Sequence, residues 1–148
     1  MTIPELSADG ILPAGIHDCT VEDIATTFGA FQESDQRPQL LKRLREFLES
    51  VKQSELASSV IVDGSFVTSK AKPSDVDMVL VLKEEHDFAA DLRPFQYNVL
   101  SSRNVRKKYS FDLLVAGENS DTYTEYVKYF QQVKGQPEKT KGVLRVTL

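Results

Sequence analysis

The chain has few of the residues from which disulfide, thiolate or membrane-spanning structures are built. It has 148 residues with one cysteine, two histidines and no tryptophan. Cys19 alone excludes an internal disulfide, and with only two histidines the chain cannot form a thiolate zinc site. The longest apolar run is the five residues from Met78 to Leu82, which is too short to span a bilayer. The opening MTIPELSADG lacks a basic, apolar leader, so we expect no secretory signal, a cytoplasmic location and no membrane partner.

An excess of positive charge is also missing. Eighteen Lys and Arg against 22 Asp and Glu give a formal charge of −4, which argues against coating nucleic acid by bulk charge. A nucleic-acid or nucleotide contact would need a local basic cluster or metal ions held by carboxylates. One dense basic cluster exists, and we interpret it as solvated surface, with an RNA or phosphate contact as the alternative. Its members are Arg103, Arg106, Lys107 and Lys108.

The length allows one domain with one hydrophobic core. Residues 1–34 carry several prolines and glycines and predict an irregular arm with one short helix, TVEDIATTFG, which Thr20 caps. Residues 35–148 should form the domain. Its strongest helix is predicted over residues 35–56, where apolar residues recur at steps of three and four. These are Leu40, Leu41, Leu44, Phe47, Leu48 and Val51.

The rest of the chain alternates between β-type and helical patterns. Strands are predicted at 59–64, 76–83, 110–117 and 142–148, the second of them apolar enough to be buried on both faces. Helical segments are predicted within 86–109, interrupted by Pro94, and within 120–134. The aromatic residues of the last helix favour a packing face, with base stacking as the alternative; they are Tyr123, Tyr126, Tyr129 and Phe130. This order predicts an α/β (α+β) fold, a small mixed sheet with helices mainly on one face.

The segment VDGSFVTSKAKPSDVDMVLVL contains the most informative polar residues. Alternate side chains of a strand share a face, so Asp75 and Asp77 should point the same way, about 6–7 Å apart. Two carboxylates so placed repel each other unless a cation lies between them, and carboxylate oxygens suit Mg²⁺. Upstream, Gly64 allows close backbone approach and Ser65 offers a hydroxyl and an N–H to a phosphate. The alternative is a Pro-Ser-Asp turn with solvated carboxylates.

A third carboxylate follows in KYSFDLLVA. Asp112 is flanked there by apolar residues, and we expect its strand to be an interior one in which the carboxylate needs a cation or hydrogen-bond partner. If this strand lies beside that of Asp75 and Asp77, three carboxylates converge. Such a trio meets the requirement for two-metal phosphoryl or nucleotidyl transfer.

Gly-Ser, a loop of nine residues, Asp-x-Asp and a third Asp on a later strand resemble the DNA polymerase β-like nucleotidyltransferase superfamily. The likeness covers residues 36–116 and is greatest to small single-domain bacterial members, the minimal nucleotidyltransferases among them. The resemblance implies that Gly64 and Ser65 hold a nucleoside triphosphate and that Asp75 and Asp77 bind two Mg²⁺ ions. It implies that Asp112 completes the metal and catalytic site, as the base or by orienting the acceptor hydroxyl.

In the loop after the serine, Ser69 and Lys70 are nucleotide-binding candidates. Lys70 and Lys72 could meet a triphosphate as point charges, with an exposed loop that keeps the protein soluble as the alternative. The sequence departs from the superfamily in two respects. Ser69 stands where many members of the superfamily have a second glycine. The C-terminal helical domain with which many members grip nucleotide or acceptor has no room in this chain.

Two functions of different classes are compatible with these residues. The first is a Mg²⁺-dependent enzyme that binds ATP or another nucleoside triphosphate and moves its nucleoside monophosphate to a hydroxyl of a protein, RNA or small molecule. The alternative is a non-catalytic or weakly catalytic binding module of a toxin–antitoxin or phage-defence pair, with a protein partner. A nucleotide sensor that binds without transfer is a third reading.

Overall fold

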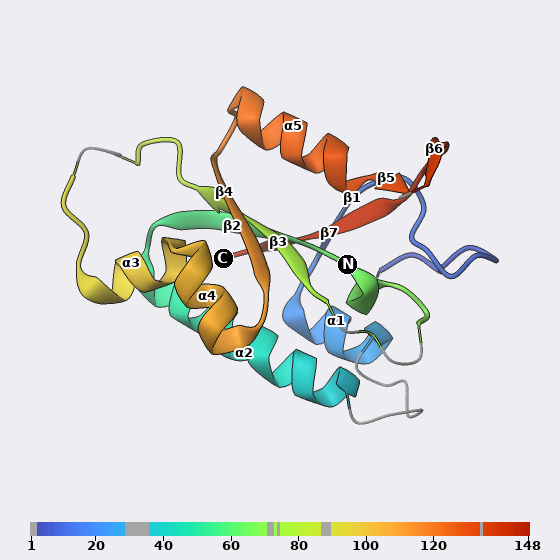
Figure 1. Ribbon diagram of the computed structural model, residues 1–148, viewed down its shortest axis with the longest axis horizontal. Coiled ribbons are helices and arrows are strands. Elements are labelled where there is room, and N and C mark those ends of the chain that lie inside the picture. Colours follow the sequence, from blue (N-terminus) through green and yellow to red (C-terminus); the bar gives the residue numbers. More distant parts are fainter. Residues whose placement is uncertain (1–2, 29–35, 71–72, 74, 87–89, 134) are drawn as a thin grey trace.

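The protein is a mixed α/β structure, as the sequence predicts (Figure 1). The computed structural model describes residues 3–28, 36–70, 73, 75–86, 90–133 and 135–148. Within these ranges no helix is both long enough and apolar enough to cross a membrane. The sequence offers Ser34 or Asp35 as the N-cap of the long helix and Gly29 as the stop of the short helix before it, and these three residues lie outside the described residues.

A five-stranded mixed sheet organises the molecule. Its strands run in the order β1-β7-β2-β3-β4 and are β1 (Gly15–Cys19), β7 (Gly142–Thr147), β2 (Ala57–Asp63), β3 (Asp77–Leu82) and β4 (Asp112–Gly117). β1 is parallel to β7 and β3 to β4, whereas β2 is antiparallel to both β7 and β3. β3 is buried from its second residue onward, in agreement with its unbroken apolar sequence.

The helices cover the two faces of this sheet unequally. One face packs against α1 (Val21–Phe28), α2 (Gln36–Ser54), α3 (Pro94–Leu100) and α4 (Ser102–Tyr109). The other face packs against α5 (Asp121–Phe130), through Val127 and Phe130. The prediction that helices lie mainly on one face is therefore confirmed for the described residues (Figure 1).

Sequence patterns explain the two helices that were predicted best. In α2 the buried side chains lie at three- and four-residue steps, the stripe that the sequence predicted. α1 starts with a reciprocal cap, because the Thr20 hydroxyl accepts from the Asp23 N–H and the Asp23 carboxylate accepts from the Thr20 N–H. The predicted packing role of the α5 aromatics is confirmed for Phe130, which is buried, while Tyr129 is 66% exposed.

The structure corrects three expectations. The arm is not wholly irregular, because Gly15–Cys19 forms β1; its sequence GIHDC, half-buried except for the buried Cys19, carries no apolar alternation. Pro94 begins α3 rather than interrupting a helix, because a first-turn N–H has no helical acceptor to lose. A short hairpin of β5 (Gln132–Val133) and β6 (Gln136–Thr140) follows α5, where no strand was predicted.

A buried arginine fixes the chain between β2 and β3. Arg37 of α2 has no exposed surface, and its guanidinium donates to the Phe66, Thr68 and Lys70 carbonyls at 2.8, 2.6 and 2.6 Å. It also donates to the Phe28 carbonyl at 3.2 Å. Because Ser65–Val67 forms the 3₁₀ turn η1 in this connection, Arg37 ties the segment that carries Ser65 to the helical layer.

Replacing Arg37 by Met should therefore lower the free energy of unfolding by about 3 kcal/mol or more, because buried carbonyls would lose charged donors. Urea unfolding measures this. Arg45→Met on the same helix is the matched control: Arg45 pairs with Glu22 at the surface, so that change should cost about 1 kcal/mol or less. Equal costs for the two variants would contradict the role given to Arg37.

Candidate functional site

Three aspartates lie level with one another on neighbouring strands. Asp63, the last residue of β2, pairs with Asp77, the first residue of β3. Asp77 pairs in turn with Asp112, the first residue of β4. Directly paired residues point to the same face of a sheet, so three carboxylates gather at one end of β2, β3 and β4. The sequence predicted the neighbourhood of Asp77 and Asp112 but not Asp63.

The Gly64–Ser65 bend brings Asp75 to the same place. Gly64 has a φ of 96°, and a Cβ there would lie 2.7 Å from the Asp75 carbonyl oxygen, so the position requires glycine. The Ser65 hydroxyl donates to the Asp75 carboxylate and accepts from the Asp75 N–H at 3.2 Å. Asp75 itself precedes β3 rather than belonging to it, but its side chain lies at the same cavity as Asp77.

The gathered charge makes ionisation of Asp77 unfavourable. Partial burial raises the pKa of Asp77 to about 6, and the charges of Asp75, Asp63 and Asp112, with a hydrogen bond to Asp112, add to the shift. Burial also raises the pKa of Asp63, although Lys141 opposes this shift. The end of the sheet is therefore a region of concentrated negative potential.

Two cations answer this charge. Lys141 donates from Nζ to Asp63 Oδ1 at 3.0 Å, and both side chains are largely buried. Arg106 of α4 donates to the Asp112 carboxylate at the surface. Asp112 departs here from the prediction: β4 is an edge strand, and the Asp112 side chain is 55% exposed and ion-paired rather than enclosed in an interior strand.

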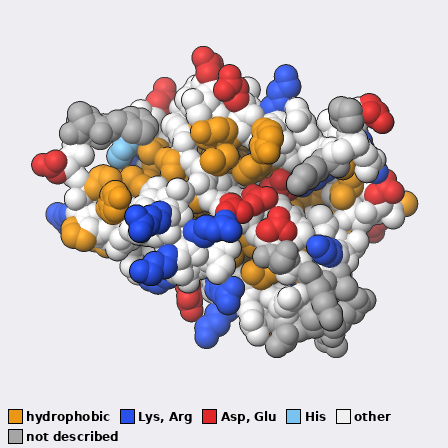
Figure 2. All heavy atoms as spheres, in the orientation of Figure 1, with side chains coloured by type: hydrophobic (Ala, Val, Ile, Leu, Met, Phe, Trp, Pro, Cys, Tyr) orange, Lys and Arg blue, Asp and Glu red, His pale blue; other side chains and the backbone are white. Residues whose placement is uncertain are grey.

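Two cavities meet at Asp77. The first, which we call the Ser65 cavity, has a volume of about 670 Å³ and contains Ser65, Asp63, Asp75 and Lys141 in its lining. The second, the Arg103 cavity, has a volume of about 610 Å³ and contains Arg103, Arg106 and Asp112. Asp77, Tyr129 and Phe130 line both. Figure 2 shows acidic side chains at the centre of this face, with basic side chains over α4 on one side and apolar ones near α5 above.

The donor set suits Mg²⁺ in chemistry but is not drawn together. Every candidate ligand is a carboxylate oxygen. Burial first, and then repulsion by the neighbouring carboxylates, raises the pKa of Asp77, and a divalent cation would relieve the repulsion. Within the described part of the chain, however, no three acidic, histidine or cysteine side chains form a group that could hold a metal ion. Asp75 and Asp112 are instead engaged by Ser65 and Arg106, contacts that a cation would have to displace.

The remaining candidates lie elsewhere. Ser69 is exposed, its N–H donates to the Gly10 carbonyl at 3.0 Å, and it does not line the Ser65 cavity. Lys70 is exposed, its carbonyl accepts from Arg37, and it too is absent from that lining. Lys72 lies outside the described residues. His17 bonds to the Pro13 carbonyl at 2.7 Å, and burial raises the pKa of Cys19 to about 12, which leaves that thiol protonated.

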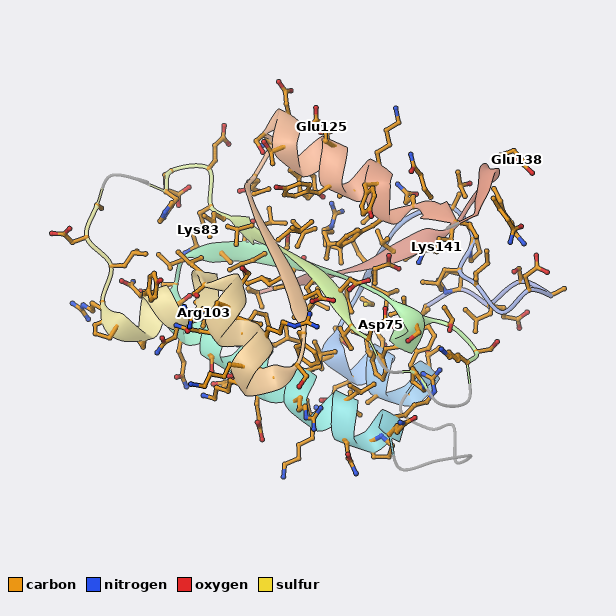
Figure 3. The ribbon with its side chains drawn as sticks, in the orientation of Figure 1. Asp75, Lys83, Arg103, Glu125, Glu138 and Lys141 are labelled. Atoms are coloured by element: carbon orange, nitrogen blue, oxygen red, sulfur yellow. The ribbon has the colours of Figure 1, made fainter. Side chains whose placement is uncertain are left out.

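Two residues of the site were not predicted. Asp63 stands in the sequence as the last residue of an apolar strand, directly before Gly64, where a buried acid is unusual enough to have been a signal. Lys141 is 78 residues from its partner, and nothing local marks it. Figure 3 shows Lys141 and Asp75 approaching the same region from β7's side and from the β2–β3 connection.

Comparison with known proteins assigns the chain to a family. The sequence model of the family of unknown function DUF6932 matches residues 4–147. The chain belongs to this family. No curated protein and no solved structure matches it. The family match therefore includes the N-terminal arm as well as the rest of the domain. The structure likewise joins the two, because β1 of the arm pairs with β7.

Asp77→Asn should stabilise the protein at neutral pH, because it removes the carboxylate with the raised pKa. The folded protein holds that proton more tightly than the unfolded chain, so the stability of the native sequence should fall as pH rises from about 4 to about 6. At pH 7.5 we expect a gain of about 1 kcal/mol, allowing for solvent screening of this half-buried group. Thermal unfolding at pH 4 and 7.5 tests this, with the exposed Glu125→Gln as control; equal gains at both pH values would contradict it.

Lys141→Met should destabilise the protein by about 3 kcal/mol, because it leaves Asp63 buried without its cation. Adding Asp63→Asn should recover a large part of that loss, since the uncompensated charge disappears. A double-mutant cycle from urea unfolding measures the coupling. Additive effects of the two changes would show that the pair is not energetically linked.

Proposed function

We propose that this protein is a Mg²⁺-dependent nucleotidyltransferase, which transfers a nucleoside monophosphate from a nucleoside triphosphate such as ATP to an acceptor hydroxyl. One observation carries the proposal: the level row of Asp63, Asp77 and Asp112 on three strands, beside the Gly64–Ser65 bend. The gathering of mutually repelling carboxylates at one end of the sheet is best explained by a cationic ligand that binds there. Gly64, Ser65 and the aspartates resemble the motif of the polymerase β-like superfamily, and this resemblance suggests nucleotidyl transfer as the reaction.

The residues take different roles in this reaction. Asp75, Asp77 and Asp112 would hold the Mg²⁺ ions, which when bound supply positive charge to the triphosphate and lower the pKa of the acceptor hydroxyl. Gly64 leaves the backbone open to a phosphate, and Ser65 offers its hydroxyl and N–H. Lys141 adds a cation to the same cavity. The Ser65 cavity lies within the size range of small-molecule sites, roughly 300–1,000 Å³.

The transfer exchanges one phosphorus–oxygen bond for another. The acceptor oxygen bonds to the α-phosphorus, the bond from that phosphorus to the β-phosphate oxygen breaks, and pyrophosphate leaves. The acceptor proton passes to Asp112, whose exposed carboxylate lines the Arg103 cavity beside Asp77, the strand neighbour that lines both cavities. A triphosphate substrate and the unpaired Cys19 fit a cytoplasmic location, which we propose with the function.

The test is incorporation of label from each nucleoside triphosphate, with Mg²⁺, into host lysate and small-molecule acceptors, together with pyrophosphate release. Asp77→Asn should reduce both by about a hundredfold or more, because a metal contact is lost. It should also abolish the rise in melting temperature that Mg²⁺ and triphosphate produce together. Glu125→Gln removes an exposed acid of α5 and should change neither.

Two results would contradict the proposal. Undiminished turnover in Asp77→Asn would show that the carboxylate row is not the site. Absence of both turnover and a Mg²⁺-dependent thermal shift with all four triphosphates would exclude a nucleotide ligand. Nucleotide binding without pyrophosphate release would favour the nucleotide sensor over the enzyme.

A further inference from the structure

We infer that the Arg103 cavity is the acceptor subsite and that the acceptor is a small organic phosphate with a flat ring, of about the size of a nucleoside monophosphate. The word acceptor rests on the proposed function; the ligand class does not. It follows from the charge, the apolar lining and the size of the cavity. The two arginines of this cavity are absent from the lining of the Ser65 cavity, which shares Asp77, Tyr129 and Phe130 with it.

The cations of the cavity call for an anion. Arg103 and Arg106 both line it, from the first and second turns of α4. Arg106 pairs with Asp112, whereas Arg103 forms no ion pair with any of the described residues. A guanidinium group presents two parallel donors that match phosphate geometry. Figure 3 shows Arg103 on α4, and Figure 2 shows the basic side chains of α4 directly beside the acidic centre.

The opposite wall of the cavity is apolar and partly aromatic. Leu113, Leu114, Tyr129 and Phe130 line it. Tyr129 is 66% exposed, so much of its ring is accessible to a ligand. An aromatic ring in that position offers a face on which a flat ligand ring can stack. The cavity therefore matches a ligand that is anionic at one end and apolar at the other.

The volume of the cavity suits a small molecule. About 610 Å³ is in the range of single-ligand sites. Asp77 forms part of the wall towards the Ser65 cavity, so a hydroxyl of the bound ligand can face the triphosphate. The transfer is then the one given above, with the ligand hydroxyl as the attacking oxygen.

Arg106 links ligand binding to the state of Asp112. The same guanidinium lines the cavity and donates to the Asp112 carboxylate. A phosphate that binds Arg106 competes with Asp112 for the N–H donors of the guanidinium group. Occupation of the cavity therefore releases Asp112 to receive the hydroxyl proton. Phosphate binding should accordingly precede or accompany efficient transfer.

Calorimetric titration with AMP, without Mg²⁺, tests the subsite. AMP supplies a phosphate, a ribose with hydroxyls and a flat base. We expect AMP to bind at least about tenfold more tightly than either of two fragments. Adenosine lacks the phosphate, and inorganic phosphate lacks the ring. Arg103→Gln should weaken AMP binding about tenfold or more, and Tyr129→Ala should weaken it severalfold. Lys107→Gln, on the same helix but outside the cavity lining, is the matched control and should change nothing.

Competition separates this subsite from the triphosphate site. AMP should bind equally well with Mg²⁺ and a saturating α,β-methylene analogue of ATP present, because the analogue belongs in the Ser65 cavity. Loss of AMP binding under those conditions, equal affinity in Arg103→Gln, or no AMP binding at all would overturn the inference. If the analogue fails to bind while AMP binds through Arg103, the proposed function fails and the anionic subsite stands. Unchanged melting temperatures will show that the exposed variants are folded.

Discussion

Repulsion among carboxylates at one end of β2, β3 and β4 is the constraint to which the rest of this region responds. Sheet register brings Asp63, Asp77 and Asp112 to the same level, and no side-chain rotation can move them far apart. Two cations partly neutralise this charge, the buried Lys141 and the exposed Arg106. The two ion pairs differ in their surroundings. The Lys141 pair is enclosed and belongs to the scaffold, whereas the Arg106 pair lies in water and is easily exchanged for another ligand.

The helical layer on one face of the sheet supports the backbone of the site. Arg37 reaches from α2 to carbonyls within and directly after η1, so the helical layer sets the path of the chain that carries Ser65. Gly64 then turns so tightly that its missing Cβ is what lets the Asp75 carbonyl approach. One rigid element therefore holds the bend, and the neighbouring strands hold the acids. Preorganisation of this type is what a reaction that depends on positioning and charge requires.

The sequence predicted those parts of the structure whose signals are local. The apolar steps of α2 and the unbroken run of β3 identified both elements, and Asp-x-Asp with Gly-Ser identified where polar chemistry gathers. Strand β1 was missed because its short segment, without apolar alternation, owes its conformation to β7, more than 120 residues away in the sequence. Lys141 was missed for the same reason, since its role is defined by Asp63. Asp112 was assigned to an interior strand because apolar neighbours do not reveal whether a strand lies at an edge.

The order of strands has a consequence for how the protein is made. β7 is inserted between β1 and β2, so this edge of β2 stays open until β7 has left the ribosome. β1, although synthesised first, has no neighbour to pair with before that moment. Closure of the sheet is therefore a long-range event in which β7 joins β1 to β2. Because Lys141 immediately precedes β7, Asp63 remains without its cation until the same stage of synthesis.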